Sequence, residues 1–450
     1  MMAFEITKDL LDNITQYITI KNDTELSVVF SEMHHADIAE ILDELSFDET
    51  LYIIRLLDSE TTAEVLIDID DDVREKVLKQ LSAKEIAEEI DELDTDDAAD
   101  IISELPEKRK QDVIQHVEDK EHAKEIVELL RYDEDSAGGL MAKELVKVNE
   151  NWTIVRCVKE MRIQAEEVTR VHSIYVVGDN GELKGRLSLK DLLMASTTSK
   201  IADVYIPKVD FVVVTDEAED VANVMRKYDL EAIPVVDELG ILLGRITIDD
   251  IVDVIKEEAE KDYQLAAGIT QDVEADDTIW ELTRARLPWL FLGLIGGVGA
   301  FLIMEGFQES FKENAVLFFF TPLIAAMAGN VGVQSSAIIV QGLANDDVKG
   351  SINNRLIKEM LLAALNGLLL ALVLFIFIWL YNGELLKAFA ISVSLIVVII
   401  IAGLIGTFIP LFLDKRGIDP AIATGPFITT SNDIFGILIY FWIAKMIIGF

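Results

Sequence analysis

One acidic residue, Asp433, lies well inside a long apolar segment near 420–448. A charged side chain inside a membrane-spanning segment costs on the order of 3 kcal/mol and is by default a functional residue. At helical spacing Asp433 shares one small, polar face with Pro426, Thr429 and Gly436. No basic residue of the apolar segments is an obvious partner, so helix packing alone does not explain this charge. We therefore predict that Asp433 faces a pore and contacts a cation there.

A second apolar segment, near 315–342, carries a matching surface. Its small residues form one stripe: Pro322, Ala325, Gly329, Gly332 and Ser336. Its amides form an adjacent stripe: Asn330, Gln334 and Gln341. Small residues let helices approach, and amide and carboxylate oxygens can replace or hold the hydration shell of a cation. For the glycines alone, plain helix packing is the competing interpretation. The predicted pore-lining residues are Pro322, Gly329, Asn330, Gln334 and Asp433.

The ligand types available in the membrane segments narrow the class of ion. All five histidines precede residue 173, and Cys157 is the only cysteine, so soft and borderline metals lose their preferred donors. Oxygen ligands suit Mg²⁺, Ca²⁺ or Mn²⁺, and Mg²⁺ is typically held with its waters by one or two carboxylates. One carboxylate per subunit, paired across a two-fold axis, would suit hydrated Mg²⁺. This argument permits magnesium without excluding Mn²⁺, Co²⁺ or Ca²⁺.

The negative charge of the chain is confined to its first part. The formal net charge is −41, but from Arg284 onward ten acidic residues face ten basic ones, so residues 1–283 carry all of it. Such a surface repels nucleic acid and anionic lipid, and its counter-ions must be cations. We therefore expect no nucleic-acid partner. The acidic N-terminus lacks an apolar signal core, so this part is expected to stay in the cytoplasm.

Five apolar segments are each about long enough to cross a hydrocarbon core of about 30 Å. They lie near 287–305, 315–342, 358–381, 385–412 and 420–448. Most basic residues of the loops fall on one side of the membrane: Arg284, Arg286, Lys349, Arg355, Lys358, Lys415 and Arg416. Only Lys312 and Lys387 fall on the other. The positive-inside rule then predicts a multi-pass protein of the cell membrane, with residues 1–286 cytoplasmic and the C-terminus outside.

The first ~130 residues contain an internal repeat. Ile38–Leu45 recurs as Thr62–Ile69 and as Ile86–Leu93, each 24 residues after the last, and Ala98–Leu105 is a half-period echo. Apolar residues at helical spacing with so short a period predict short helices stacked in a small α-solenoid. The expected N-caps are Ser46, Ser59, Ser82 and Asp94. Such a domain has no catalytic signature and is a scaffold or a sensor.

A second repeat follows at an offset of 59 residues. Ser173–Val177 is matched by Ala232–Val236, and Gly185–Asp191 by Gly244–Asp250. Each unit reads as strand, turn, strand and then a helix capped by Ser or Thr. These tandem units resemble a pair of CBS domains. In that family the Ser or Thr and the Asp of the motif can bind the ribose and phosphates of an adenine nucleotide such as ATP. The corresponding residues are Ser188 with Asp191, and Thr247 with Asp250, and helix capping is the competing interpretation.

We therefore expect a multidomain protein. Residues 1–134 form an acidic, cytosolic, all-α superhelical solenoid domain, and residues 135–200 and 201–256 form two α/β CBS domains. Ile251–Asp262 continues from the second CBS unit as an acidic helix that runs towards the membrane part, and residues 257–283 form the connecting helix. Residues 284–450 form an all-α transmembrane domain of five helices.

This order of domains resembles the MgtE family of magnesium channels and transporters over nearly the whole chain. The most specific motifs are Glu134–Met141 before the first CBS unit, Pro322–Gln334 in the second span, Asp419-Pro-Ala, and Asn432-Asp433 in the fifth span. The resemblance implies Mg²⁺ influx through a homodimer, whose pore is formed by the second and fifth spans and in which Asp433 binds hydrated Mg²⁺.

The resemblance also implies regulatory Mg²⁺ sites between the cytosolic domains. Matched motif by motif, the implied ligands are Glu64, Asp96 and Asp100 in the helical domain, and Glu217, Glu219, Asp229, Asp250 and Asp253 in and after the second CBS unit. Further ligands would be Glu258 and Asp262 on the connecting helix and Asp419 at the cytoplasmic edge of the membrane. In one departure from the family pattern, Lys261 stands where a further acid is expected. Mg²⁺ would bridge carboxylates that otherwise repel, so that cytosolic Mg²⁺ closes the channel.

Three other classes of function compete with this hypothesis. An anion channel regulated by CBS domains is disfavoured by the acidic cytosolic face and by Asp433. A membrane metalloprotease needs HExxH or an equivalent histidine pair in a span, and no histidine follows His172, so we expect no enzyme. A sensor anchored in the membrane would have no need of Asp433.

Overall fold

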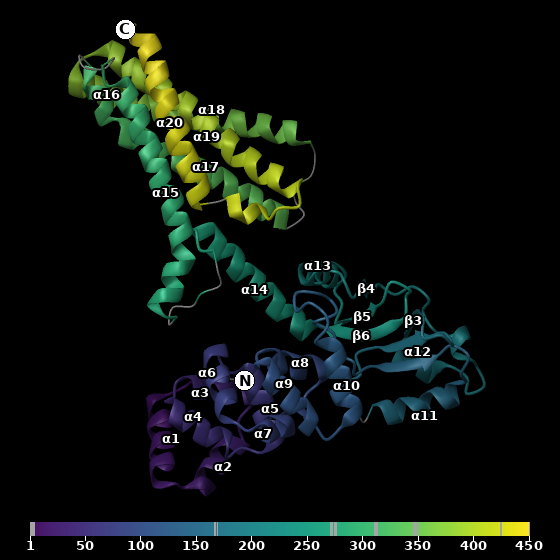
Figure 1. Cartoon of the computed structure of the whole chain (residues 1–450). Helices are drawn as coiled ribbons and strands as arrows, with labels where there is room; N and C mark the ends of the chain where they lie inside the picture. Colours follow the sequence, from purple (N-terminus) through teal and green to yellow (C-terminus); the bar gives the residue numbers. More distant parts are fainter. Residues whose placement is uncertain are drawn as a thin grey trace. The chain divides into compact units, whose positions relative to one another are not determined.

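The chain divides into two compact units in the computed structural model. We call Met1–Ile255 the acidic unit and Lys256–Phe450 the membrane unit (Figure 1). The structure describes residues 5–165, 168, 170–270, 273, 277–309, 314–344, 348, 351–423 and 425–449. Two of the loop residues used to predict orientation, Lys312 and Lys349, lie outside the described residues.

Ten short helices make up the first part of the acidic unit. They are α1 (Lys8–Ile20), α2 (Asp23–Ser31), α3 (His35–Asp43), α4 (Phe47–Ile54), α5 (Ser59–Asp68), α6 (Asp71–Gln80), α7 (Ala83–Ile90), α8 (Thr95–Ser103), α9 (Glu107–His116) and α10 (Lys120–Leu129). Helices α3, α5, α7 and α9 start 24 residues apart, and each packs on the next of these four. The predicted helical solenoid is confirmed, and its period extends one unit beyond the repeats recognised in the sequence.

The repeat sequence explains the core of this stack. Its first position is occupied by Ile38, Thr62 and Ile86, which are all fully buried. Thr62 fits there because its hydroxyl donates to the carbonyl of Ile54 (3.4 Å). Burial of these side chains on successive helices joins the repeats into one hydrophobic core.

Three of the four predicted N-caps are confirmed. Ser46 and Ser82 form capping boxes with the glutamates three residues later, and Asp94 precedes α8. The prediction for Ser59 was wrong, because Asp58 is the N-cap of α5. Its carboxylate accepts a hydrogen bond from the Thr61 amide (3.1 Å) and another from the Thr61 hydroxyl (3.0 Å). A carboxylate at the positive end of the helix displaces the hydroxyl from that role.

Two three-stranded sheets with the same topology complete the acidic unit. The first contains β1 (Val146–Asn149), β2 (Ile174–Val177) and β3 (Leu183–Leu187), and the second β4 (Val212–Val213), β5 (Ala232–Val236) and β6 (Leu242–Thr247). In each sheet the first strand is parallel to the second, which is antiparallel to the third. The associated helices are α11 (Ile154–Gln164), α12 (Leu189–Met194), η1 (Ile201–Asp203) and α13 (Ala218–Tyr228). Helix α14 (Ile248–Ala267) begins in the acidic unit, and its residues from Lys256 onward belong to the membrane unit.

Among its described residues, the membrane unit has five helices that are long and apolar enough to span a bilayer. The unit contains α15 (Ile279–Phe307), α16 (Val316–Phe319), α17 (Thr321–Ala344), α18 (Ile352–Asn382), α19 (Leu385–Asp414), η3 (Pro420–Ala423) and α20 (Gly425–Ile448). Helices α16 and α17 together form the second span. The five-helix prediction is confirmed, although the fifth helix starts at Gly425 rather than 420. Residues Pro420–Ala423 form a separate turn, in which Asp419 accepts a hydrogen bond from the Ala421 amide (2.7 Å).

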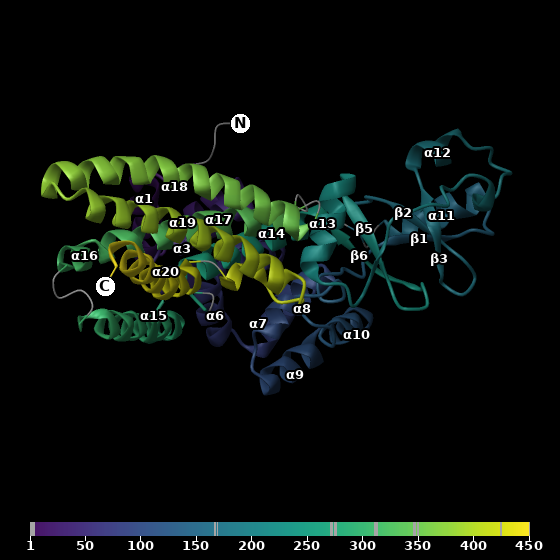
Figure 2. The ribbon, with the colours of Figure 1, turned by 90° about the horizontal axis from the view of Figure 1, so that it is seen from above.

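Helices α17, α19 and α20 pack against one another, with α18 beside α19 and α15 beside α20 (Figures 1 and 2). Glycines allow the close approach at the centre. A Cβ atom added to Gly406 on α19 would contact the carbonyl oxygen of Gly332 on α17, and one added to Gly332 would contact the Asn432 amide on α20. This contact of three helices therefore depends on residues without side chains.

The first prediction concerns this contact. Gly406→Ala should lower the free energy of unfolding of the membrane unit by about 1–3 kcal/mol, because a backbone carbonyl cannot move aside for the added methyl group. Thermal unfolding of the detergent-solubilised protein measures the effect as a lower melting temperature. Gly293→Ala and Gly297→Ala on α15 are matched controls, since no described atom lies within 4 Å of their added Cβ. A melting temperature for Gly406→Ala equal to that of the controls would contradict the prediction.

Candidate cation sites

A cavity of about 450 Å³ lies between α17 and α20 in the membrane unit. Its lining residues are Ala325, Ala326, Gly329, Asn330, Val333, Gln334, Thr429 and Asp433. Four of the five predicted pore residues therefore lie together here. The fifth, Pro322, is in the first turn of α17 and is exposed, and it is not among the lining residues.

The spacing of α17 and α20 leaves the carboxylate of Asp433 accessible from this cavity. A Cβ atom on Gly329 would lie 3.2 Å from the Thr429 methyl carbon and 4.0 Å from Asp433 Oδ1, so a larger residue would fill the space beside the carboxylate. The Thr429 hydroxyl donates to the carbonyl of Gly425 (2.9 Å), which turns its methyl group towards Gly329. The donors that remain are a carboxylate and two amides, a set suited to a hard cation with part of its hydration shell.

Sequence reasoning missed the role of one carboxylate on the third membrane-spanning helix, α18. Glu359 of α18 accepts a hydrogen bond from the hydroxyl of Ser335 on α17 (Oε1 to Oγ, 2.6 Å), and Ser335 is buried. Ser335 follows Gln334 of the cavity, so this bond fixes α17 from the side of α18. The signal in the sequence was a glutamate at the start of the third predicted span, near 358–381, to which no role was assigned.

The last part of α14 places Asp262 near Asp419, the residue directly before η3. The pKa of Asp262 is raised, first by its burial and then by the nearby charges of Asp419 and Glu258. Glu258 itself pairs with Lys261 (Oε1 to Nζ, 2.9 Å), the residue that departs from the family pattern. Asp262 and Asp419 are thus the better candidates to share an ion, because Lys261 partly neutralises the charge of Glu258.

The end of α14 also contacts α20 directly. Added Cβ atoms on Gly268 and Gly425 would contact the Pro426 side chain and the Ala266 carbonyl, respectively, so both glycines permit a close approach. Gly268 and Gly425 both have positive φ angles, which glycine adopts without strain. A movement of this end of α14 would therefore displace the first residues of α20, the helix that carries Asp433.

Six carboxylates gather in the acidic unit, and we call them the acidic cluster: Asp94, Asp96, Asp97, Asp100, Glu144 and Asp250. Carboxylate oxygens of Asp94, Asp96 and Glu144 all lie within 4.8 Å of one another. Four members lie at the N-cap and first two turns of α8, Glu144 lies just before β1, and Asp250 lies in the first turn of α14. Each of the three segments is fixed by hydrogen bonds of its own.

Threonines hold the two members that come from outside α8. Glu144 Oε2 accepts hydrogen bonds from the amide (3.2 Å) and the hydroxyl (2.8 Å) of Thr95. Asp250 Oδ2 accepts hydrogen bonds from the amide (3.0 Å) and the hydroxyl (2.8 Å) of Thr247. These bonds leave at least one oxygen of each carboxylate for a further partner.

The pKa values of the acidic cluster are raised. Removal from solvent and the neighbouring carboxylates raise the pKa of Asp94 to about 6, that of Asp100 to about 7 and that of Asp97 to about 8. Burial, followed by the charge of Asp97, raises the pKa of Asp96 well above its ordinary value. Burial also raises the pKa of Asp250, against the lowering effect of its bonds with Thr247. The carboxylates of the cluster therefore repel one another unless protons or a cation reduce their negative charge.

Sequence reasoning identified Asp96, Asp100 and Asp250 of this cluster and missed Asp94, Asp97 and Glu144. Asp94 was assigned only as an N-cap, which it also is. Glu144 follows the Glu134–Met141 motif by three residues, and proximity to that motif was the available signal. Its contact with α8 depends on the path of the chain between α10 and β1, which sequence spacing does not provide.

The remaining predicted ligands of the acidic unit do not join the cluster. Glu217 and Glu219 lie at the start of α13 and Asp229 at its end, about 18 Å apart at 1.5 Å per residue. Asp253 is exposed on α14. Glu64 is exposed and lies 3.6 Å from His35 Nε2, although its charge still contributes to the raised pKa values of Asp94 and Asp97.

The two residue pairs proposed for nucleotide binding both act as helix caps. Ser188 accepts a hydrogen bond from the Lys190 amide (3.2 Å) at the start of α12, and Thr247 is bonded to Asp250 at the start of α14. Asp191 is part of α12 and is half-buried. Because Asp250 belongs to the acidic cluster, its surroundings repel a phosphate group.

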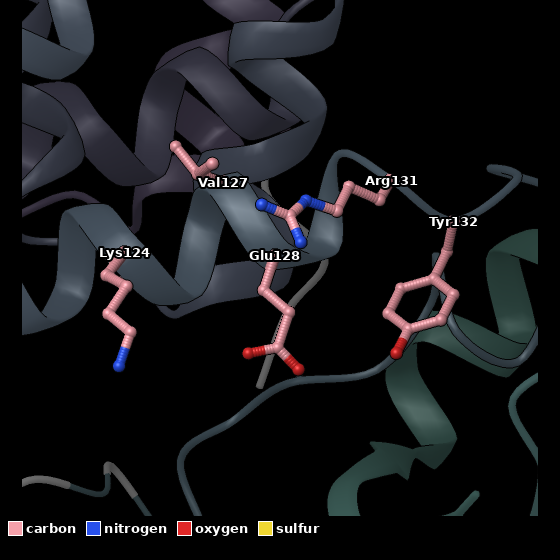
Figure 3. A pocket seen from close by; sticks show the side chains of 5 residues that line it. All are labelled: Lys124, Val127, Glu128, Arg131 and Tyr132. Atoms are coloured by element: carbon pink, nitrogen blue, oxygen red, sulfur yellow. The ribbon is translucent and has the colours of Figure 1, made fainter.

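Another cavity of the acidic unit has a different character. It measures about 360 Å³ and is lined by Lys124, Val127, Glu128, Arg131 and Tyr132 of α10 and the turn after it (Figure 3). Figure 3 shows Lys124, Glu128 and Tyr132 extending to the same side of the helix. Glu128 pairs with Lys143 (3.0 Å), so this cavity offers a cation no uncompensated carboxylate.

Comparisons with known proteins agree with these domains. Residues 321–443 match the MgtE family, described as a divalent cation transporter. Residues 33–135 match the MgtE intracellular N domain, and residues 137–197 and 201–257 each match the CBS domain. The predicted CBS pair is therefore confirmed.

Relatives of similar length carry the same family name. The magnesium transporter MgtE of Enterococcus faecalis (strain ATCC 700802 / V583) is 38% identical over 322 residues, which is 71% of each chain. That of Bacillus subtilis (strain 168) is 35% identical over 321 residues, again 71% of each chain. A crystal structure of the cytosolic domain of the Mg²⁺ channel MgtE in complex with ATP is similar with 33% identity and a TM-score of 0.51, covering 54% of this chain and 100% of that chain.

These relatives are transporters, in agreement with the prediction that the chain is not an enzyme. The matched residues include most of the acidic unit and, in the membrane unit, α17, α18, α19 and most of α20. The chain belongs to the MgtE family of magnesium transporters and is a multi-pass membrane protein.

Proposed function

We propose that this chain forms a Mg²⁺-selective channel for influx, with a pore built by α17 and α20 at the axis of a homodimer, and that cytosolic Mg²⁺ closes it. The observation that carries the proposal is the cavity in which Asp433 lies beside Gly329, Asn330 and Gln334. It joins a carboxylate inside a membrane helix to amide oxygens on the facing helix. Such a set can hold a hydrated divalent cation, and plain helix packing does not explain the cost of its carboxylate.

The choice of Mg²⁺ rests on the family and on the donors of the cavity. The relatives in Enterococcus faecalis and Bacillus subtilis are named magnesium transporters. The cavity lining contains oxygen donors and neither histidine nor cysteine, which disfavours soft and borderline metals. One carboxylate per chain is few for a divalent ion, and a two-fold axis through the pore would supply a second one.

Regulation by cytosolic Mg²⁺ is supported by the raised pKa values of the acidic cluster. Bound Mg²⁺ would offset the repulsion that these carboxylates exert on one another and so favour the compact form of the acidic unit. Glu64, Asp96, Asp100 and Asp250 are the proposed ligands in or beside the cluster. Asp262 with Asp419, the partly neutralised Glu258, and the exposed Glu217, Glu219, Asp229 and Asp253 would serve further ions.

Coupling to the pore would run through the end of α14. The Ala266 carbonyl lies against Gly425, and Gly268 lies against Pro426. Gly425 and Pro426 precede Asp433 on α20 by eight and seven residues, respectively. The orientation that fits this function has the acidic unit in the cytoplasm and the C-terminus outside. ATP binding at Ser188 and Asp191 is retained as a proposal, supported by the relative crystallised with ATP. The surroundings of Asp250 make the pair Thr247 and Asp250 the weaker of the two nucleotide sites.

Asp433→Ala should reduce Mg²⁺ flux into liposomes at least tenfold and fail to rescue growth of a bacterium deficient in Mg²⁺ uptake, because the pore loses its only carboxylate among the cavity residues. Glu305→Ala is the matched control, since it removes an exposed acid near the end of α15 and should keep wild-type flux. Asp433→Glu, which retains the charge, should rescue in part. Full rescue by Asp433→Ala would overturn the pore assignment and favour a sensor, and Cl⁻ flux in the same vesicles would favour an anion channel.

Asp96→Asn combined with Asp250→Asn should leave flux intact at low internal Mg²⁺ and raise the internal Mg²⁺ concentration needed for closure by about tenfold or more, because two ligands of one site are neutralised. Patch-clamp recording from excised membrane patches, with Mg²⁺ varied on the cytoplasmic side, measures the shift. Asp112→Asn on α9 is the control, since it removes an exposed acid outside the acidic cluster. An unchanged Mg²⁺ dependence of the double variant would disprove regulation at this cluster.

Without Mg²⁺, the melting temperature of the acidic unit should fall as the pH rises from about 6 to about 8. The folded-state pKa values of Asp94, Asp100 and Asp97 exceed the ordinary value of 3.8, so their protonated forms favour folding. Their contribution is therefore complete below about pH 4 and is lost as the pH rises through the folded-state values. Saturating Mg²⁺ should make this loss smaller, because the metal replaces the protons. Calorimetry of the whole protein in chelator and in Mg²⁺ tests both statements, and a melting temperature independent of pH in chelator would refute them.

A further inference from the structure

One buried cation, Arg245, faces the acidic cluster. Arg245 belongs to β6 and is only 5% exposed. Its Nη2 lies 3.5 Å from Asp94 Oδ2, and its Nη1 donates a hydrogen bond to the carbonyl of Arg170 (3.0 Å). Its Nε has no hydrogen-bond partner among the described residues. A buried guanidinium that lacks some of its hydrogen-bond acceptors attracts nearby carboxylates strongly, because little else offsets its positive charge.

The backbone holds Arg245 firmly in this place. Its amide donates to the carbonyl of Ala142 (2.9 Å), and its carbonyl accepts from the Ala142 amide (2.8 Å). On the other side, Arg245 pairs with Pro234 of β5. An added Cβ on Gly244 would lie 2.6 Å from the Ala142 carbonyl oxygen, so glycine is required for this approach. The same bonds place Glu144, two residues after Ala142, at the acidic cluster.

The internal repeat of the acidic unit offers a comparison. Arg186 occupies the position equivalent to Arg245 in the first CBS unit, 59 residues earlier and again directly after a glycine. Arg186 is exposed on β3, whereas Arg245 is buried on β6. The strand position alone therefore does not bury an arginine, and the contact with the acidic cluster distinguishes the second unit.

Two other basic side chains near the cluster form ion pairs with acids outside it. Lys143 pairs with Glu128 (3.0 Å). Arg74 pairs with Asp71 and with Glu104. The charge of Arg74 also lowers the pKa of one member of the cluster, Asp100. Arg245 acts on two members, because its charge lowers the pKa of Asp94 and that of Asp250 against the effect of burial.

We infer that Arg245 is a built-in counter-ion of the acidic cluster, which stabilises the compact acidic unit when Mg²⁺ is absent and weakens the binding of Mg²⁺ when it is present. Arg245 thereby sets the Mg²⁺ concentration at which the cluster fills. This inference rests on the proposed regulation by Mg²⁺ at the same cluster, and it adds the residue that tunes it.

The physical basis is competition between two cations for the same carboxylates. A guanidinium fixed within a few ångströms of a bound divalent ion repels it, and removal of that charge should tighten Mg²⁺ binding about tenfold at the intermediate dielectric of such a site. The carboxylates would then repel one another more strongly in the metal-free form. The same change should therefore destabilise the metal-free protein and increase the stabilisation gained from Mg²⁺.

The test uses the full chain in detergent with the variant Arg245→Met, which removes the charge and keeps a long side chain. The melting temperature of this variant in chelator should be lower than that of the wild type. Addition of a fixed Mg²⁺ concentration should raise the melting temperature of the variant by more than it raises that of the wild type, as expected for a Mg²⁺ dissociation constant about tenfold lower. Arg245→Lys, which keeps the charge, should show the wild-type rise. Arg186→Met is the matched control and should change neither value.

Two results separate this inference from the proposed regulation. If Arg245→Met lowers the melting temperature equally with and without Mg²⁺, Arg245 is only a packing residue and the inference is wrong. If the wild type itself gains no stability from Mg²⁺, the proposed regulation fails instead. Should Arg245→Met not fold in chelator, Arg245→Gln, which keeps a donor for the Arg170 carbonyl, gives the same comparison.

Discussion

Repulsion between carboxylates that are held close together and away from water is the constraint on which the acidic unit depends. Folding places six of them around the start of α8, although each would be more stable apart and hydrated. The raised pKa values of Asp94, Asp97 and Asp100 express this cost. Hydrogen bonds from Thr95 and Thr247 fix the geometry but do not remove the charge. The unit is therefore organised so that its stability depends on what cation is present, which suits the proposed sensor of ion concentration.

The membrane unit meets a different requirement, because it holds the carboxylate of Asp433 on an apolar helix and leaves it accessible from a cavity. Gly329, Gly332 and Gly406 let α17 approach both α19 and α20, and the small side chains leave space beside Asp433 instead of filling it. The hydrogen bond between Ser335 and Glu359 joins α17 to α18. Close packing on one face of α17 and an oxygen-lined cavity on another thus follow from the same helix.

The sequence predicted those features that depend on local periodicity. The 24-residue repeat gave the solenoid, and helical spacing placed Asp433 and Thr429 on one face opposite Gly329. The pairing of Glu258 with Lys261 was not predicted, although their spacing of three residues on a helix would have indicated it. The acidic cluster could be predicted only in part, because Asp94, Glu144, Arg245 and Asp250 come from segments far apart in the chain. Similarly, Glu217 and Asp229 were both named from the family motifs of the second CBS unit, and the length of α13 shows that they lie apart.

The helical stack of the acidic unit has one further mechanical consequence. Each of α3, α5, α7 and α9 rests on its immediate neighbours in the series, so the stack behaves as a one-dimensional chain of units with nearest-neighbour coupling. Fraying that begins at α1 and α2 must pass several independent interfaces before it reaches α8. The free end of the solenoid can therefore vary in sequence or lose order with little effect on the residues that surround the cation site, which leaves evolution free to remodel that end.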